Sequence, residues 1–137
     1  LRSSLENAES TSVILLDTMG ELARVYSLGQ IAFVGRSLVQ PGGGHSLIEP
    51  LSHGLAVLHG PYVENINHVS ETAHNQGLVF QMTNPEELEQ KVHTLLKNPS
   101  HRLEISEKAK IFITQQQGAA RKMADIITQC LSIAKPD

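Results

Sequence analysis

Glycines, hydroxyl groups and carboxylates gather at three points where an apolar run gives way to a helical pattern. These segments are Asp17–Glu21, Gly35–Ser46 and His59–Asn67. A glycine at the start of a helix leaves backbone N–H groups available to an anion, so a phosphate would be stabilised there. Glu49, inside the helical pattern after the second segment, can accept two hydrogen bonds from the vicinal hydroxyls of a ribose.

Two of these segments also fit a purely structural role. Thr18 with Glu21, and Ser46 with Glu49, have the spacing of a capping box, in which both side chains satisfy a helix end. The run Gly42–Gly44 is followed by no Lys and lacks the dinucleotide spacing, so it is neither a Walker loop nor a Rossmann fingerprint. Close approach of the backbone to a ligand is one reason to keep such a flexible run. Capping and ligand binding both stay open at this point.

Seven histidines and one cysteine are the other reactive side chains. The histidines have neither HExxH spacing nor Cys partners, so we expect no metal site and no cofactor. His45 lies between the glycines and the next helical pattern, and we keep it with Gly44 as a candidate phosphate or sugar contact. Cys130 belongs to an apolar stripe at helical spacing, so we expect a core thiol rather than a nucleophile.

Short apolar runs alternate with helical patterns along the chain. The expected strands are Thr11–Leu16, Ile31–Val34, Ala56–Leu58 and Leu78–Phe80. Helices are expected over 20–29, 46–53, 67–76, 85–98, 100–116 and 119–134, with stops at Gly29, Gly54 and Gly77. Asn84 and Pro85 fit the cap and first position of the fourth helix, whose apolar face is Leu88, Val92, Leu95 and Leu96.

This alternation predicts βαβ units and a parallel sheet, because a crossover between parallel strands needs an intervening helix. The expected fold class is a doubly wound α/β domain, a Rossmann-like parallel sheet flanked by helices. Ligands bind such sheets beyond the carboxyl ends of the strands. The three segments that carry the glycines and carboxylates follow the first three expected strands and so belong at that edge.

Length, charge and composition exclude several classes of function. The 137 residues fit one domain, and a net charge of −3 with scattered Lys and Arg does not favour nucleic acid as a partner. No apolar run approaches the roughly 20 residues of a membrane span, so we expect a soluble chain. A single cysteine fits a reducing compartment such as the cytoplasm. The chain begins with Leu, so we expect a piece of a longer protein.

Five strings run in order along nearly the whole chain. They are Asp17–Leu22, Ala32–Val39, Gly43–Pro50, Gly60-Pro61 with Asn65, and Gln117–Ala119. Read together, they resemble the C-terminal, nucleotide-binding domain of the transferases of Kdo (3-deoxy-D-manno-octulosonic acid), which are GT-B glycosyltransferases. The resemblance implies that the binding site for CMP is formed by two segments: Met19, Gly20 and Glu21, and Ser46, Leu47, Ile48 and Glu49.

Two positions depart from the family pattern. The family commonly has Asn-Pro-Leu-Glu at Ser46–Glu49, so a ribose contact carries over to Glu49, whereas a contact of the Asn amide does not carry over to Ser46. Arg36 stands where the family often has Gly, and it is expected to crowd or supplement an anion site.

The resemblance also implies a reaction and its partners. Such an enzyme transfers Kdo from CMP-Kdo to a lipid A precursor (lipid IVA) in lipopolysaccharide core biosynthesis, by an inverting, metal-independent route. Its N-terminal acceptor domain carries a membrane anchor and the general base. Residues 1–137 would then be the donor-binding domain, with no catalytic residue and no activity alone. The parent enzyme would lie at the cytoplasmic face of the bacterial inner membrane.

Two rival hypotheses stay open. The chain could belong to another GT-B enzyme or an epimerase of the same fold that uses UDP-sugars, and a preference for uridine nucleotides would favour that hypothesis. Alternatively, it could be a nucleotide-binding or protein-interaction module without chemistry of its own. In that case Glu21 and Glu49 would only cap helices.

Overall fold

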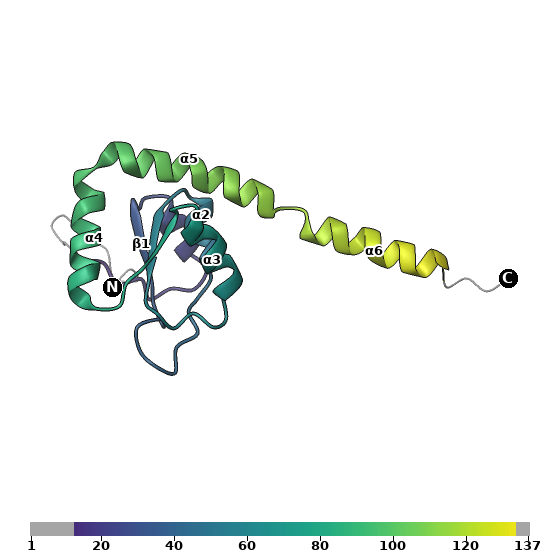
Figure 1. Ribbon diagram of the computed structural model, residues 1–137, viewed down its shortest axis with the longest axis horizontal. Coiled ribbons are helices and arrows are strands. Elements are labelled where there is room, and N and C mark those ends of the chain that lie inside the picture. Colours follow the sequence, from purple (N-terminus) through teal and green to yellow (C-terminus); the bar gives the residue numbers. More distant parts are fainter. Residues whose placement is uncertain (1–12, 134–137) are drawn as a thin grey trace.

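Three strands form one parallel sheet, which lies among the helices in the left-hand part of the molecule in Figure 1. The computed structural model describes residues 13–133, and only the backbone of residue 67, residues 119–122 and residues 131–133. The strands are β1 (Ile31–Val34), β2 (Ala56–His59) and β3 (Val79–Gln81). Val34 pairs with His59 and His59 with Gln81, so the three carboxyl ends meet at one edge. The expected parallel α/β class is confirmed.

One expected strand and the doubly wound order are not found among the described residues. The strands run consecutively as β1-β2-β3, without the reversal that a doubly wound sheet requires. The strand expected at Thr11–Leu16 is wrong over residues 13–16, which join no strand and leave Val13 82% exposed. Residues 11 and 12 lie outside the described range. A continuous apolar run becomes a buried strand only where neighbouring elements cover it, and no element formed by residues 13–133 does so.

All six expected helices form, with somewhat different ends. They are α1 (Leu22–Tyr26), α2 (Ile48–Ser52), α3 (Asn67–Asn75), α4 (Pro85–Lys97), α5 (Pro99–Gln116) and α6 (Ala119–Ile133). Gly54 and Gly77 end α2 and α3 as expected, with φ angles of +74° and +70° that glycine adopts without penalty. In the turn after α2, the Leu55 amide donates to the Pro50 carbonyl at 3.2 Å.

The core lies around β2, whose four residues are all buried. Leu51 of α2, Leu95 of α4 and Phe112 of α5 pack into the same apolar cluster. The expected apolar face of α4 is confirmed for Leu95 and, in part, for Leu88 and Val92, which pack against that cluster. The expected apolar face is wrong for Leu96, which is largely exposed. The four expected residues cover a wider part of the helix surface than the part that contacts the core.

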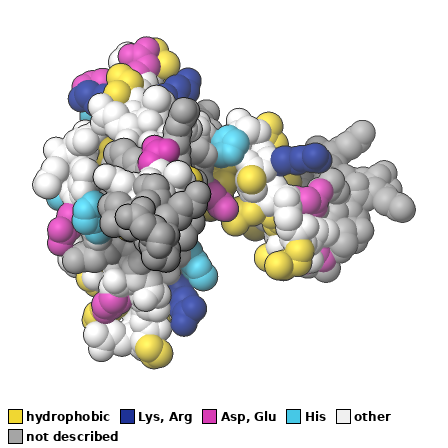
Figure 2. Space-filling view, turned by 90° about the vertical axis from the view of Figure 1, so that its right-hand side faces the viewer, with side chains coloured by type: hydrophobic (Ala, Val, Ile, Leu, Met, Phe, Trp, Pro, Cys, Tyr) yellow, Lys and Arg dark blue, Asp and Glu magenta, His cyan; other side chains and the backbone are white. Residues whose placement is uncertain are grey.

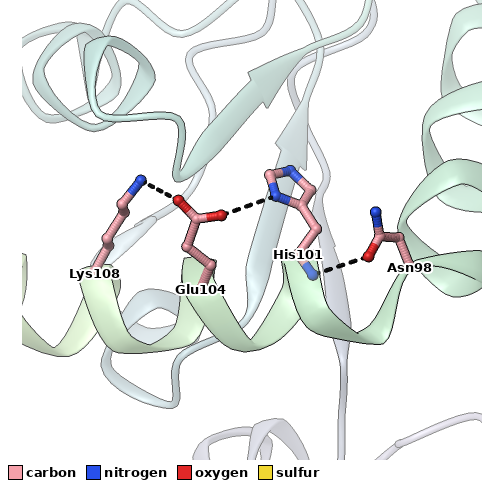
Figure 3. Close-up of polar contacts among 4 residues, drawn as sticks. All are labelled: Asn98, His101, Glu104 and Lys108. Atoms are coloured by element: carbon pink, nitrogen blue, oxygen red, sulfur yellow. Dashed lines mark hydrogen bonds and ion pairs between the residues drawn. The ribbon is translucent and has the colours of Figure 1, made fainter.

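A single residue, Asn98, joins α4 to α5. Its Oδ1 accepts a hydrogen bond from the His101 amide at 3.0 Å, so it caps the start of α5 while it ends α4. Figure 3 shows this cap and the exposed pairs that follow it on α5. Glu104 lies 3.6 Å from His101 Nδ1 and 2.6 Å from Lys108 Nζ. The hydrogen bond and charge of Lys108, with a smaller effect of His101, hold the pKa of Glu104 below its ordinary value.

Helix α6 extends away from the body that the sheet and the other helices form (Figure 1). Its residues Met123, Ile126 and Ile127 are therefore exposed, and so is Cys130. The expectation of a core thiol at Cys130 is wrong, because none of the elements in the described part of the chain covers this stretch of α6. Hydrophobic side chains also reach the surface at several places in the view of Figure 2. Within residues 13–133, no helix has the length and apolar character needed to cross a bilayer.

Candidate functional site

A groove beside α1 unites parts of the two segments that the sequence singled out. It has a volume of 470 Å³ and is lined by Leu16, Thr18, Met19, Gly20, Leu22, Ala23 and Glu49. We call it the Glu49 groove. Met19 and Gly20 from the first segment thus lie with Glu49 from the second, although α1, β1 and a long loop separate them in sequence. Glu21, Ser46, Leu47 and Ile48 do not line it.

The first segment is open to solvent at Met19 and Gly20. The Met19 side chain is 99% exposed, and a Cβ placed on Gly20 would meet no atom within 4 Å. The Thr18 hydroxyl donates to the Glu21 carboxylate, and Glu21, the residue before α1, makes no side-chain cap to the helix. The capping-box alternative is therefore wrong here, because the two side chains bind each other instead of the helix end. Nothing in this segment blocks the approach of a ligand to the Gly20 backbone.

The second segment combines one anchored residue with exposed polar groups. Leu47 is 1% exposed and belongs to the core, so it can reach a ligand only through its backbone. The Ser46 hydroxyl accepts from the Ile48 amide at 3.3 Å, so Ser46 satisfies one amide at the start of α2. Among the described residues, the Glu49 side chain makes no return bond to the Ser46 amide, so the reciprocal capping box does not form. Glu49 is exposed in the first turn of α2 and faces the groove.

The glycine run is explained in part by contact between two loops. A Cβ on Gly42 would lie 2.5 Å from Tyr62 Cβ, and one on Gly44 would lie 2.8 Å from Ile66 Cδ1. Gly43 is held at both ends, because its amide donates to Tyr62 O at 3.2 Å and its carbonyl accepts from the Asn65 amide at 3.2 Å. A larger side chain at Gly42 would also meet the backbone oxygens of Arg36 and Tyr62 at 3.2 Å, so it would push the loops apart. A larger side chain at Gly44 would instead displace the Ile66 side chain.

These contacts decide which amides can still meet a phosphate. The Gly44 amide donates to the Arg36 carbonyl at 3.0 Å, so it is already paired within the protein. In the described part of the chain, the amides of His45 and Ser46 make no such bond, and both residues are exposed. Arg36 has a φ of +56°, in the left-handed region that favours glycine. A glycine would adopt this backbone shape without strain, whereas Arg36 adopts it at a cost.

The carboxylate of Glu49 influences its surroundings beyond the groove. Partial burial raises the pKa of Tyr26 above its ordinary value, and the negative charge of Glu49 raises it further. The Tyr26 ring also lies beside the ring of His53 after α2, with 6.2 Å between ring centroids, so α1 and α2 meet at this point. Tyr26 was not singled out by the sequence analysis. The signal that would have found it is its position on the helix that directly follows the Asp17–Glu21 segment.

A second polar cluster lies under α3 at the carboxyl end of β2. His59 is 1% exposed, and because Gly60 O can only accept, the His59 Nδ1–H donates to it at 2.6 Å. Nε2 then accepts from the Ser70 hydroxyl at 3.0 Å. Burial lowers the pKa of His59, the bond to Gly60 opposes this, and His74 lowers it again. His59 is therefore a neutral, fully paired histidine. Within residues 13–133, no group of His, Cys, Asp or Glu side chains could hold a metal ion.

A parallel sheet with glycine-rich loops gathered at the carboxyl ends of its strands defines a ligand-binding α/β domain of the nucleotide-binding type. Comparison with known proteins then narrows the class. The model of the family described as glycosyl transferases group 1 matches residues 1–112, and the chain belongs to this family.

Three curated proteins that are similar to this chain are all described as transferases. A 3-deoxy-D-manno-octulosonic acid transferase of Aquifex aeolicus is 40% identical over 94 residues, which cover 69% of this chain and 26% of that protein. The transferase of the same description from Haemophilus influenzae is 32% identical over 120 residues, 87% of this chain and 28% of that protein. A bifunctional glycosyltransferase/methyltransferase of Fusobacterium nucleatum is 40% identical over 96 residues, 68% of this chain and 15% of that protein.

A solved structure agrees with these relatives. The crystal structure of the C-terminal CMP-Kdo binding domain of WaaA from Acinetobacter baumannii matches with a TM-score of 0.71 and 30% identity, over 77% of this chain and 54% of that one. The resemblance to Kdo transferases inferred from the sequence is confirmed, as is the expected GT-B type of fold. The chain spans between 15% and 28% of the length of the three curated relatives named above.

Proposed function

We propose that this chain binds the donor CMP-Kdo in an enzyme that transfers Kdo to a lipid A precursor. The observation that carries the proposal is the Glu49 groove, where Met19 and Gly20 meet Glu49. These residues come from the two segments that the family resemblance assigns to CMP. The relatives named as Kdo transferases and the CMP-Kdo binding domain of similar structure support the choice of donor.

The chemistry of the groove suggests how the nucleotide is oriented. A carboxylate accepts hydrogen bonds from ribose hydroxyls and repels phosphate, so the ribose belongs at Glu49 and the phosphate away from it. The exposed amides of His45 and Ser46 are the nearest candidates in sequence for the phosphate, and the open backbone at Gly20 can approach the nucleoside closely. In this arrangement Leu47 anchors the segment in the core while its neighbours contact the ligand.

In the proposed reaction this chain stabilises the leaving group. An acceptor hydroxyl, deprotonated by a base in another part of the enzyme, attacks the anomeric carbon of Kdo as CMP departs. Negative charge then grows on the departing phosphate, where preorganised N–H groups are most effective. A strict divalent-metal requirement would contradict this scheme.

The rest of the enzyme is also a proposal. Because the chain spans only 15–28% of the curated relatives named above, we place the acceptor site, the general base and any membrane attachment in an N-terminal domain. Under this proposal residues 1–137 act as a donor-binding domain and do not transfer Kdo alone. The parent enzyme works at the cytoplasmic face of the inner membrane.

An amide-shift titration of the isotopically labelled chain tests the nucleotide site. CMP is compared with UMP and UDP, and residues 18–21 and 43–49 are followed. We expect shifts confined to these segments and strongest for CMP. Glu49→Gln should weaken CMP binding about tenfold or more, since hydrogen bonds to a charged group are worth about 1.5–3 kcal/mol. Glu107→Gln, at an exposed carboxylate on α5, is the matched control.

The alternatives give different results in the same titration. Stronger shifts with uridine nucleotides would indicate that the chain belongs to an enzyme of this fold that uses UDP-sugars. If neither the chain nor the complete enzyme binds any of the three nucleotides, the donor-site proposal is overturned. A Glu49→Gln variant that keeps full CMP affinity would remove the ribose contact from the proposal.

A further inference from the structure

A second groove opens between the loop after β1, which contains Gly42–Gly44, and the loop after β2. It has a volume of 610 Å³ and is lined by Gln40, Pro41, Gly42, Gly43, Glu64 and Asn65. We call it the Gln40 groove. Its walls come from the loop after β1 and the loop after β2, so it lies at the carboxyl edge of the sheet, where ligands of this architecture bind. None of the residues predicted from the sequence to bind CMP lines it.

The lining favours a ligand rich in hydroxyl groups. The amides of Gln40 and Asn65 each offer donors and acceptors, and the carboxylate of Glu64 offers acceptors. A sugar hydroxyl both donates and accepts, so it matches this set. No Lys or Arg is among the described residues that line the groove, and Glu64 would repel a phosphate. A volume of this size lies within the range of small-molecule sites.

The walls of the groove are fixed by the backbone. The Tyr62 amide donates to Ser37 O at 3.0 Å, and the buried Ser37 hydroxyl accepts from the Gly60 amide at 2.8 Å. The bonds of Gly43 to Tyr62 and Asn65 close the other side. Preorganised walls reduce the entropy cost of binding, so exposed side chains here can still recognise a ligand.

The Gln40 groove lies close in sequence to the residues proposed to contact the phosphate. Gly43 in its wall precedes Ser46 by three residues, and three extended residues span at most about 10 Å. A sugar joined to a nucleotide through one phosphate can therefore occupy the Gln40 groove while its phosphate meets the His45 and Ser46 amides.

We propose that the Gln40 groove holds the hydroxyl-bearing part of the donor sugar, with Gln40 and Glu64 as the side chains that recognise it. This inference rests on the proposed function, because it presumes a nucleotide bound next to Ser46. The carboxylate of a sugar acid is directed away from Glu64 by charge repulsion. Gln40 and Glu64 then set the specificity for the sugar and leave the affinity for free CMP unchanged.

Kinetics of the complete enzyme that carries this chain test the assignment. Gln40→Ala and Glu64→Gln should each raise the KM for CMP-Kdo at least fivefold. The inhibition constant of CMP should change less than twofold, because free CMP lacks the Kdo group that the groove would hold. Gln115→Ala, at an exposed glutamine on α5, is the control and should change neither constant. Both tested side chains are exposed, so melting temperatures should stay at the wild-type value.

Two results overturn the inference, and they are distinguishable. If CMP inhibits the wild-type enzyme but both variants keep the wild-type KM for CMP-Kdo, the groove does not hold the sugar and the nucleotide site stands. If CMP neither inhibits nor binds the wild-type enzyme, the proposed function fails and the sugar assignment falls with it.

Discussion

The carbonyl oxygen of Ser37 occupies the space that any side chain on Gly60 would need. A Cβ built on Gly60 would lie 2.1 Å from Ser37 O, and the Gly60 amide donates to Ser37 Oγ at 2.8 Å. The Ser37 hydroxyl in turn donates to Val34 O at 2.7 Å, so it ties the end of β1 to the turn after β2. This buried joint sets the spacing of the two loops that form the Gln40 groove.

Gly60→Ala should therefore destabilise the protein by about 2–3 kcal/mol, because backbone atoms cannot yield as a flexible side chain can. Chemical unfolding in urea measures the change. Gly35→Ala is the control, since its Cβ would meet no atom within 4 Å and its φ is not positive. Equal stabilities of the two variants would show that the joint relaxes easily.

His59 predicts a dependence of stability on pH. Its pKa is lowered in the folded state, so the unfolded chain binds a proton more readily. This contribution to stability is complete above the unfolded pKa of about 6.5 and is lost as the pH falls from there towards the folded value. Urea midpoints between pH 8 and pH 5 should show the loss for wild type and a smaller one for His59→Gln. Identical pH profiles of the two proteins would contradict the assignment.

The cap at Asn98 should matter more than the ion pairs after it. Asn98→Ala removes the acceptor of the His101 amide and should cost about 1 kcal/mol. Glu104→Gln removes exposed pairs with His101 and Lys108, and its effect should be smaller. Thermal melts at neutral pH compare the two variants. A larger effect of Glu104→Gln than of Asn98→Ala would mean that the ion pairs, rather than the cap, stabilise the turn between α4 and α5.

The stripe on α6 should tolerate polar side chains. Ile126 is exposed, so Ile126→Gln should change the free energy of unfolding by less than about 0.5 kcal/mol. Ile105 is 1% exposed in the core, and Ile105→Ala should cost about 2–5 kcal/mol. Cys130 should also react with a thiol reagent in the folded protein, without prior unfolding. A protected thiol together with a destabilising Ile126→Gln would show that α6 is covered in solution.

Local patterns predicted those elements whose signals are local. The cap of α4 illustrates this, because Asn84 and Pro85 suffice to start a helix and Asn84 Oδ1 accepts from the Glu87 amide at 2.8 Å. The exposure of Val13 and Cys130 could not be predicted in the same way. An apolar stripe shows that a surface can be buried, whereas burial itself depends on which elements reach it.

The candidate site was predictable to a similar degree. Gly20 and Glu49 were predicted together from the family resemblance, and both line the Glu49 groove. The strand expected before Gly20 gave this prediction no support, because residues 13–16 form none. The glycine run was harder, because its close partners Tyr62 and Ile66 lie in another loop. Glycine spacing alone cannot tell a close approach to a ligand from a close approach to a neighbouring loop.

The contacts of Gly42 and Gly44 with Tyr62 and Ile66 have an evolutionary consequence. Because each loop fills the space that the other leaves, an enlarged residue in one requires a compensating change in the other. Homologous sequences should therefore show paired substitutions at these positions, or none. Helix α2 and strand β2 separate the two loops along the chain, yet substitutions in one loop should be accompanied by substitutions in the other.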